Sequence, residues 1–224
     1  MRYIMQNYWP TLFYKPKTKT KGFIMELFEI PPSGNCHKIR LFLSLLQVPY
    51  QSAHVDVANL QQKSESFLKM NPLGQLPVLK DEDIVLWDSQ AILVYLARQY
   101  AAPSWLPLDA LGMSRVMEWL STAANEVARG PSALRVHYKF GRAIAMDDAL
   151  QATATVMSLL EQHLKTVNWL AADHITIADI AVYPYIALAP EGKIDLKPYP
   201  AICSWLNRIQ ALPNYVGMPE MWQK

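Results

Sequence analysis

The sequence has only two cysteines and no long apolar run. Cys36 and Cys203 lie far apart, and neither belongs to a CxxC pair. No cysteines and histidines share the spacing of metal ligands, so the sequence predicts neither a zinc site nor a disulfide framework. This cysteine usage is typical of a reducing cytoplasm, where we expect the protein to act. No apolar run approaches the roughly 20 residues of a membrane-spanning helix, so we expect no membrane partner.

Acidic residues are absent from positions 1–24, which contain five lysines and arginines. The rest of the chain carries 16 basic against 19 acidic side chains, so the net charge of +2 comes from this segment. A mildly acidic body predicts no nucleic-acid partner. The basic segment also lacks the apolar core and cleavage site of a secretory signal. It is a flexible arm, a targeting segment or the product of a mis-assigned translation start, and we favour a start at Met25.

The composition is that of a folded chain, because 51% of the 224 residues are hydrophobic and the charge is modest. Prolines at 103 and 107 mark a loop-like stretch. Strand patterns occur only before that stretch, and every periodic segment after it is helical. We therefore expect an N-terminal extension over 1–24, an α/β domain over 25–101, a linker over 102–110 and an all-helical domain over 111–224.

The α/β domain begins with a strand, a helix and a second strand. An apolar strand pattern covers 25–30, and Ser33-Gly34-Asn35 forms a polar turn into a helix. Alternating residues over 52–57 predict a half-buried strand, which completes a βαβ unit. A short helix follows over 64–70. The first helix has its apolar face at Ile39, Phe42, Leu43 and Leu46.

The stretch 71–96, NPLGQLPVLKDEDIVLWDSQAILVYL, organises this half of the chain. Runs rich in β-branched and aromatic residues at 78–79 and 84–87 flank an acidic turn, which predicts a β-hairpin. Asp88 and Ser89 then precede an apolar stripe at helical spacing. Either side chain is suited to cap the first turn of that helix.

Pro77 stands directly before one of these strands, where a proline removes a hydrogen bond from the ladder. A cis bond between Leu76 and Pro77 explains its presence. Such a bond turns the backbone of Leu76 outward, where an extended peptide can pair with it. The far end of that peptide meets the helix that begins at Asp88 and Ser89.

The C-terminal half reads as a series of helices. One amphipathic stripe runs over 113–127, and Gly130-Pro131 interrupts it. Further helices are predicted over 132–145 and 147–167. The last helix has its apolar face at Ile202, Trp205, Leu206 and Ile209.

Two stretches of the sequence resemble known motifs. NPLGQLPVL, its polar turn and Asp88-Ser89-Gln90-Ala91-Ile92 resemble the glutathione-binding signature of the cytosolic glutathione S-transferase superfamily. HITIADIAVYP resembles the buried capping segment of that family's helical domain, so we interpret Thr176 and Asp179 as a folding element rather than a catalytic pair. The resemblance covers residues 25 to about 212.

The resemblance implies a thioredoxin-like domain of order βαβ-α-ββα, followed by an all-α domain. It also implies a bacterial-type, theta- or zeta-like enzyme with a catalytic serine. Glutathione is then the co-substrate, without a metal, and small hydrophobic electrophiles are detoxified by conjugation. On the same ground we expect a homodimer.

The chemistry expected of such an enzyme is stabilisation of the glutathione thiolate. A free thiol titrates near ~8.5, so little thiolate is present at neutral pH. A hydroxyl that donates to the anion contributes roughly 1.5–3 kcal/mol, and a helix N-terminus adds roughly 0.3–1 kcal/mol. Together they lower the thiol pKa by roughly 1.5–3 units. The thiolate then predominates at pH 7 without a general base.

Ser33 is the candidate donor. In SGNCHKIRL it occupies the position of the catalytic serine in the theta- and zeta-like classes. Ser33-x-x-Cys36 keeps the CxxC spacing of the thioredoxin fold, with serine in place of the nucleophilic cysteine. The alternative is that Ser33 only caps the helix. Some relatives use the residue two places on, here Asn35, as the donor.

The other ligand contacts follow from the resemblance. Leu76 pairs its backbone with the cysteinyl residue, and Gln75 is a further contact. Asp88 and Ser89 hold the γ-glutamyl end, because an acid meets its ammonium and a helix N-terminus meets its carboxylate. The glycyl carboxylate is expected near Gln62 and Lys63.

The electrophile pocket is expected between the domains, beside Trp119, Asn125 and Arg129. Two other functions remain open from the sequence. Cys36 or Asn35 supports a glutathione-dependent disulfide reductase or peroxidase. A non-enzymatic binding protein of the same fold is the third possibility, although the complete motif argues against it.

Overall fold

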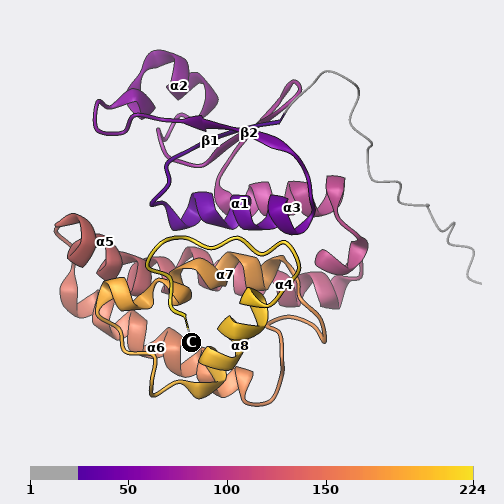
Figure 1. The fold of residues 1–224 in the computed structure, drawn as a ribbon, viewed down its shortest axis with the longest axis vertical. Coiled ribbons are helices and arrows are strands. Elements are labelled where there is room, and N and C mark those ends of the chain that lie inside the picture. Colours follow the sequence, from indigo (N-terminus) through magenta and orange to yellow (C-terminus); the bar gives the residue numbers. More distant parts are fainter. Residues whose placement is uncertain (1–24, 224) are drawn as a thin grey trace, which may run out of the picture.

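A four-stranded mixed sheet forms the centre of the N-terminal domain (Figure 1). The computed structural model describes residues 25–223, so the expectations for the segment 1–24 lie outside the described residues. The elements of this domain are β1 (Met25–Glu29), α1 (Gly34–Leu45), β2 (Tyr50–His54), η1 (Gln61–Lys63), α2 (Glu65–Met70), β3 (Val78–Asp81), β4 (Ile84–Trp87) and α3 (Ser89–Tyr100).

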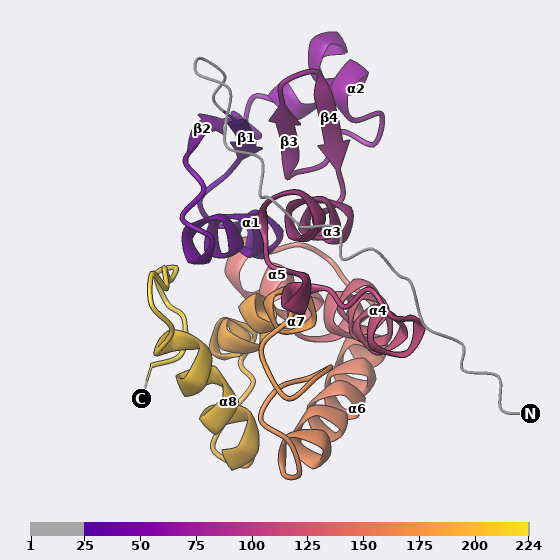
Figure 2. The ribbon, with the colours of Figure 1, turned by 90° about the vertical axis from the view of Figure 1, so that its right-hand side faces the viewer.

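The strand order is β2-β1-β3-β4. β1 pairs with β2 in parallel, and β3 pairs antiparallel with both β1 and β4. Helices α1 and α3 cover one face of the sheet and α2 lies on the other (Figure 2). This is the predicted thioredoxin-like order βαβ-α-ββα, which the structure confirms.

The second strand lies two to three residues earlier than the predicted range 52–57. Met25 pairs with Tyr50 and Glu29 with His54, so β2 ends where its partner β1 ends. The N–H of Val55 still bonds to the carbonyl of Glu29 at 3.0 Å before the chain turns away. Val55 is buried, as the alternation predicts, although it lies outside the strand.

The rest of the chain is helical, and no described residue after Trp87 belongs to a strand. This confirms the predicted all-α domain. Its elements are η2 (Pro103–Trp105), α4 (Ala110–Ala124), η3 (Ala128–Ser132), α5 (Ala133–Phe140), α6 (Met146–Leu164), α7 (Ile177–Ala187), η4 (Ala189–Gly192) and α8 (Pro200–Gln210).

Two helix boundaries differ from those predicted. The helix expected over 132–145 ends at Phe140, because Gly141 adopts φ +67° and terminates it in the left-handed conformation. The helix expected over 147–167 begins at Met146 and ends at Leu164. The interruption at Gly130-Pro131 is confirmed as the π-helical turn η3.

Helix α7 is the centre of the fold. All its residues are buried, and it packs against α4 in its own domain and against α1 and α3 in the other. The predicted capping box is present: Asp179 Oδ2 accepts the N–H of Thr176, and Oδ1 accepts the indole N–H of Trp205, both at 3.0 Å. One apolar core therefore spans both domains. No helix in the described part of the chain is long and apolar enough to cross a bilayer.

Candidate functional site

Ser33 occupies the N-cap of α1. Its backbone is extended, with φ −80° and ψ 120°, and its Oγ accepts the N–H of Cys36 at 3.2 Å. A hydroxyl that accepts through its oxygen still has its proton to donate. Ser33 can therefore cap α1 and donate to an anion at the same time, so the two roles expected from the sequence are compatible.

Cys36 lies in the first turn of α1 and is fully buried, with no disulfide. Burial raises the pKa of its thiol, and the hydrogen bond with Ser33 opposes that rise. A buried, protonated thiol is a poor nucleophile. These properties fit a packing role for Cys36. Asn35, half-buried in the same turn, is the alternative donor.

The N-termini of α1 and α3 lie at the same edge of the sheet. Because β1 and β4 both run antiparallel to β3, the helices that follow them start at one end of the domain. Lys38, in the second turn of α1, reaches across to Ser89, with 3.5 Å between Nζ and Oγ. Two positive helix ends therefore converge, an arrangement that stabilises anions.

Asp88 and Ser89 open α3, which confirms the predicted cap. Asp88 Oδ1 accepts the N–H groups of Gln90 and Ala91 at 2.9 and 3.0 Å. The φ of Asp88 is +72°, a backbone conformation that is uncommon outside glycine and clusters at functional sites. Ser89 is only 3% exposed, and it donates to Gln90 Oε1 at 2.6 Å. An exposed acid and a buried hydroxyl thus meet at one helix end.

Gln62 and Lys63 lie on η1, against the loop that leads to β3. Lys63 Nζ donates to the carbonyl of Leu73 at 2.9 Å. Gln62 Oε1 is buried and has no hydrogen-bond partner among the described residues. Gly74, at φ +60°, permits this close approach, because a Cβ there would lie 2.6 Å from the carbonyl oxygen of Gln62. The 3₁₀ turn and the loop thus form one continuous wall.

The bond between Leu76 and Pro77 is cis, as the sequence predicts. Because β3 begins at Val78, the backbone of Leu76 lies outside the sheet ladder. Asn71 Nδ2 donates to the carbonyl of Gln75 at 2.9 Å and fixes the loop. The structure therefore gathers into one loop cluster the residues predicted for the cysteinyl and glycyl parts of the ligand: Gln62, Lys63, Gln75 and Leu76.

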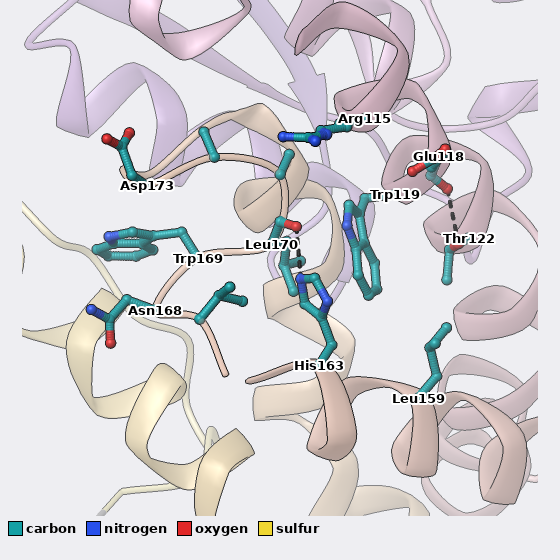
Figure 3. Close-up of a pocket in the computed structure, with 13 residues that line it drawn as sticks. Arg115, Glu118, Trp119, Thr122, Leu159, His163, Asn168, Trp169, Leu170 and Asp173 are labelled. Carbon is teal, nitrogen blue, oxygen red and sulfur yellow. Dashed lines mark hydrogen bonds between the residues drawn. The ribbon is translucent and has the colours of Figure 1, made fainter. Parts of the chain in front are cut away.

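The structure brings together only two of the three residues expected around the electrophile, Asn125 and Arg129, and Trp119 faces a different place. The Trp119 ring lies 5.0 Å from that of His163 and lines a cavity of about 830 Å³ (Figure 3). The other lining residues come from α4, α6 and the segment after α6, with none from the N-terminal domain. Asn125 and Arg129 are exposed at the end of α4, where Arg129 donates to Asn125 Oδ1 at 3.4 Å.

Two residues beneath the site were not singled out from the sequence. Lys38 is buried on α1, and its Nζ lies 5.6 Å from the centre of the Tyr185 ring. That ring, from α7, also packs on Gly34. Burial raises the pKa of Tyr185, and hydrogen bonds from Ser132 and from the backbone N–H of Asn35 oppose the rise. A lysine within an apolar helical stripe is a usable signal, whereas a tyrosine in the apolar α7 is not.

Comparison with family models matches residues 24–98 to the "Glutathione S-transferase, N-terminal domain" and residues 124–213 to the "Glutathione S-transferase, C-terminal domain". The chain belongs to the glutathione S-transferase family. The resemblance seen in the sequence is thereby confirmed, and the named relatives support a transferase of this family.

Related proteins cover most of this transferase. Glutathione S-transferase theta-1 of Bos taurus is 29% identical, over 88% of this chain and 86% of its own. The disulfide-bond oxidoreductase YfcG of Escherichia coli K12 is also 29% identical, over 81% and 88%. A solved glutathione transferase homologue of Drosophila mojavensis, with bound glutathione, is 28% identical and has a TM-score of 0.77, covering 85% of this chain and 89% of its own. The names of these relatives therefore include both reactions that the sequence left as alternatives, glutathione transfer and disulfide reduction.

Proposed function

We propose that this transferase stabilises glutathione as its thiolate and joins it to small hydrophobic electrophiles. The observation that carries the proposal is the convergence of two helix N-termini, with the Ser33 hydroxyl at one and Ser89 at the other. Ser33 Oγ accepts a backbone N–H through its oxygen, so its proton remains available to donate to the sulfur of bound glutathione. The bound thiol then loses its proton to water, and Ser33 and the end of α1 stabilise the anion.

We assign the remaining contacts along an extended glutathione. Asp88 meets the γ-glutamyl ammonium, and Ser89 with the α3 N-terminus meets the γ-glutamyl carboxylate. The backbone of Leu76 pairs with the cysteinyl residue. Three side chains of the loop cluster line the path to the glycyl carboxylate: Gln62, Lys63 and Gln75. Gln62 Oε1 has no partner among the described residues and is an acceptor, so we assign it to an N–H of the extended ligand rather than to the glycyl carboxylate.

For the electrophile we propose the helical domain near α4, with Trp119, Asn125 and Arg129 as the residues to test. The structure separates Trp119 from the other two, since Trp119 faces the cavity of Figure 3. Single alanine variants therefore report on different surfaces. A change in electrophile preference with Asn125→Ala or Arg129→Ala, and none with Trp119→Ala, places the pocket at the end of α4.

Disulfide reduction is the second candidate, and one named relative favours it. The buried, protonated thiol of Cys36 does not support direct attack on a disulfide. A reductase would therefore use the glutathione thiolate itself, held by Ser33 or Asn35. Turnover of a mixed disulfide that survives Cys36→Ser supports that route.

The experiment that tests the proposal is binding followed by turnover. The native protein is titrated with glutathione in a calorimeter and is then assayed with an activated aryl halide and, separately, with a mixed disulfide. Conjugation supports the proposed function, and turnover of the disulfide alone supports the second candidate. Absence of glutathione binding contradicts both. Detoxification and a cytoplasmic location belong to the same proposal, and conjugation activity in the cytosolic fraction of fractionated cells tests them.

A further inference from the structure

Lys38 places a cationic side chain wholly inside the protein, with 1% of it exposed. Burying an ammonium group without a carboxylate partner is costly. Among the described residues no carboxylate forms an ion pair with Lys38. The charge is therefore only partly compensated in the free protein, and an anion that binds nearby would complete its compensation.

The surroundings of Lys38 show where that anion would bind. Its Nζ donates a long hydrogen bond of 3.5 Å to Ser89 Oγ, at the N-terminus of α3. From α7 the Tyr185 ring faces it at 5.6 Å. Asp88 is the charged group that acts on Lys38, and it lies beyond ion-pair distance. The ammonium is thus directed at the hydroxyl that opens α3.

We propose that Lys38 is a positioning residue for the γ-glutamyl end of glutathione. Its ammonium orients the Ser89 hydroxyl and supplies the positive charge that the bound carboxylate neutralises, so that glutathione binds together with a proton on Lys38. This inference rests on the proposed function and adds to it a residue and a proton linkage.

The hydrogen bonds of Ser89 show how the orientation works. In the free protein Ser89 Oγ accepts from Lys38 and donates its proton to Gln90 Oε1 at 2.6 Å. With Lys38 donating to the oxygen, the hydroxyl proton is the part of Ser89 that a carboxylate meets. On binding, the ligand carboxylate replaces the Gln90 amide oxygen as the acceptor of that proton.

The same geometry makes binding sensitive to pH. Burial lowers the pKa of Lys38 to about 8, and the negative charge of Asp88 opposes that decrease. A carboxylate at Ser89 adds a second negative charge and raises the pKa of Lys38 in the complex. Above about pH 8, binding therefore takes up a proton, and affinity falls by up to about tenfold per pH unit.

The test uses S-methylglutathione, which has no thiol proton to titrate. Calorimetry in two buffers of different ionisation enthalpy, at pH 8.5, measures proton uptake by the native protein, which needs no variant to fold. The ligand's own amine contributes equally with every variant. The difference between native protein and Lys38→Met therefore isolates the lysine.

We expect Lys38→Met to bind S-methylglutathione about 10- to 100-fold more weakly at pH 7, the range of a hydrogen bond to a charged group. Its affinity also loses the part of the decrease above about pH 8 that titration of Lys38 causes. With glutathione and an electrophile, the KM for glutathione rises while kcat stays near the native value. Lys38→Arg keeps the charge at every pH and so binds without the pH step. Lys69→Met, on the exposed face of α2, is the matched control and changes neither quantity.

Equal affinity and equal proton uptake in native protein and Lys38→Met would overturn the role of Lys38 while leaving the proposed function intact. If native protein and Lys38→Met take up the same number of protons on binding at pH 8.5, the role of Lys38 is likewise overturned and the proposed function remains. A native protein that does not bind S-methylglutathione at all would remove the proposed function together with this inference.

Discussion

His37, in the first turn of α1, is fully buried, and neither ring nitrogen has a hydrogen-bond partner among the described residues. Burial lowers its pKa to about 3, and the positive charge of Arg40 adds to the decrease. The unfolded chain titrates near 6.5. Below that pH the unfolded state binds a proton that the folded state does not, so stability is complete above pH 6.5 and is lost as the pH falls towards 3.

We therefore expect titration of His37 to lower the free energy of unfolding by about 2 kcal/mol between pH 7.5 and pH 5. The decrease is ~1.4 kcal/mol for each pH unit below the pKa of the unfolded chain. His37→Leu removes the titrating group and flattens this dependence. His54→Gln, at an exposed position, is the control and keeps the native slope. Urea unfolding at the two pH values measures the difference. Parallel slopes for native protein and His37→Leu would show that His37 is not the group.

Ser33 makes two contributions that a single variant separates. Ser33→Ala removes a hydrogen bond to the thiolate, and we expect kcat/KM for conjugation to fall about 10- to 100-fold. If Ser33 only capped α1, Ser33→Ala would lower the free energy of unfolding by about 1 kcal/mol and would leave the pH profile of kcat/KM unchanged. The apparent pKa of the kcat/KM profile should therefore rise by about 1–2 units, the equivalent of that hydrogen bond. An unchanged profile in Ser33→Ala and a shifted one in Asn35→Ala would move the role to Asn35.

At the scale of elements, α7 depends on its cap. The Asp179 carboxylate is wholly buried and accepts from the N–H of Thr176, the N–H of Leu170 and the indole of Trp205, each at 3.0 Å. Asp179→Ala leaves these donors without an acceptor. We expect a loss of at least about 3 kcal/mol in the free energy of unfolding, because each orphaned donor costs roughly 1–3 kcal/mol.

Asp109, the exposed N-cap of α4, is the matched control for that experiment. Its Oδ1 accepts one backbone N–H, that of Gly112 at 2.8 Å. Asp109→Ala should cost about 1 kcal/mol, as exposed caps do. Similar losses in the free energy of unfolding for Asp179→Ala and Asp109→Ala would contradict a central structural role for the buried cap of α7.

The sequence was sufficient for elements whose signals are local. The β-hairpin, the cis proline and the cap at Asp88 all follow from residues within a few positions of one another. The second strand and the end of α5 were misplaced. The strand's length is set by its pairing with β1 from Met25 to Glu29, a partner far away in sequence. The helix end is set by Gly141, a local C-cap residue at φ +67° that the helical periodicity alone did not reveal.

The candidate site was only partly predictable for the same reason. Ser33, Leu76, Asp88 and Ser89 belong to motifs, so the sequence could predict them as site residues. Lys38 could be noticed as a lysine within an apolar helical stripe, but its surroundings depend on three helices that meet around the ammonium group, which no local pattern encodes. Trp119 has helical spacing and aromatic character on α4, but it faces the His163 ring of α6 in a cavity that the N-terminal domain does not line. Long-range packing therefore determines those parts of the candidate site that sequence motifs do not predict.

At the scale of the whole molecule, an apolar surface remains uncovered. Ile84, Val85 and Trp87 on β4 are exposed, and so are Leu111 and Met117 on α4. β4 and α4 lie on the same side of the molecule in Figure 2. Exposed apolar groups gathered in this way commonly mark an association surface. We propose that this side is the interface of the expected homodimer.

We expect sedimentation of the native protein to give twice the chain mass of 25.5 kDa. Met117→Lys places a charge in the proposed interface and should shift the protein to monomers. Leu150→Lys, at an exposed apolar position on α6, is the control and should stay dimeric. A native protein that sediments at the chain mass contradicts the dimer, and a dimeric Met117→Lys moves the interface elsewhere.

The central claim is that two helix ends and one hydroxyl hold glutathione as its thiolate. The most direct measurement is the ultraviolet absorbance of thiolate in the native complex as a function of pH. The account predicts that bound glutathione loses its thiol proton with a pKa of about 5.5–7, roughly 1.5–3 units below its value in water, and that Ser33→Ala returns it part of the way. A bound thiol that still titrates near ~8.5 would contradict the account.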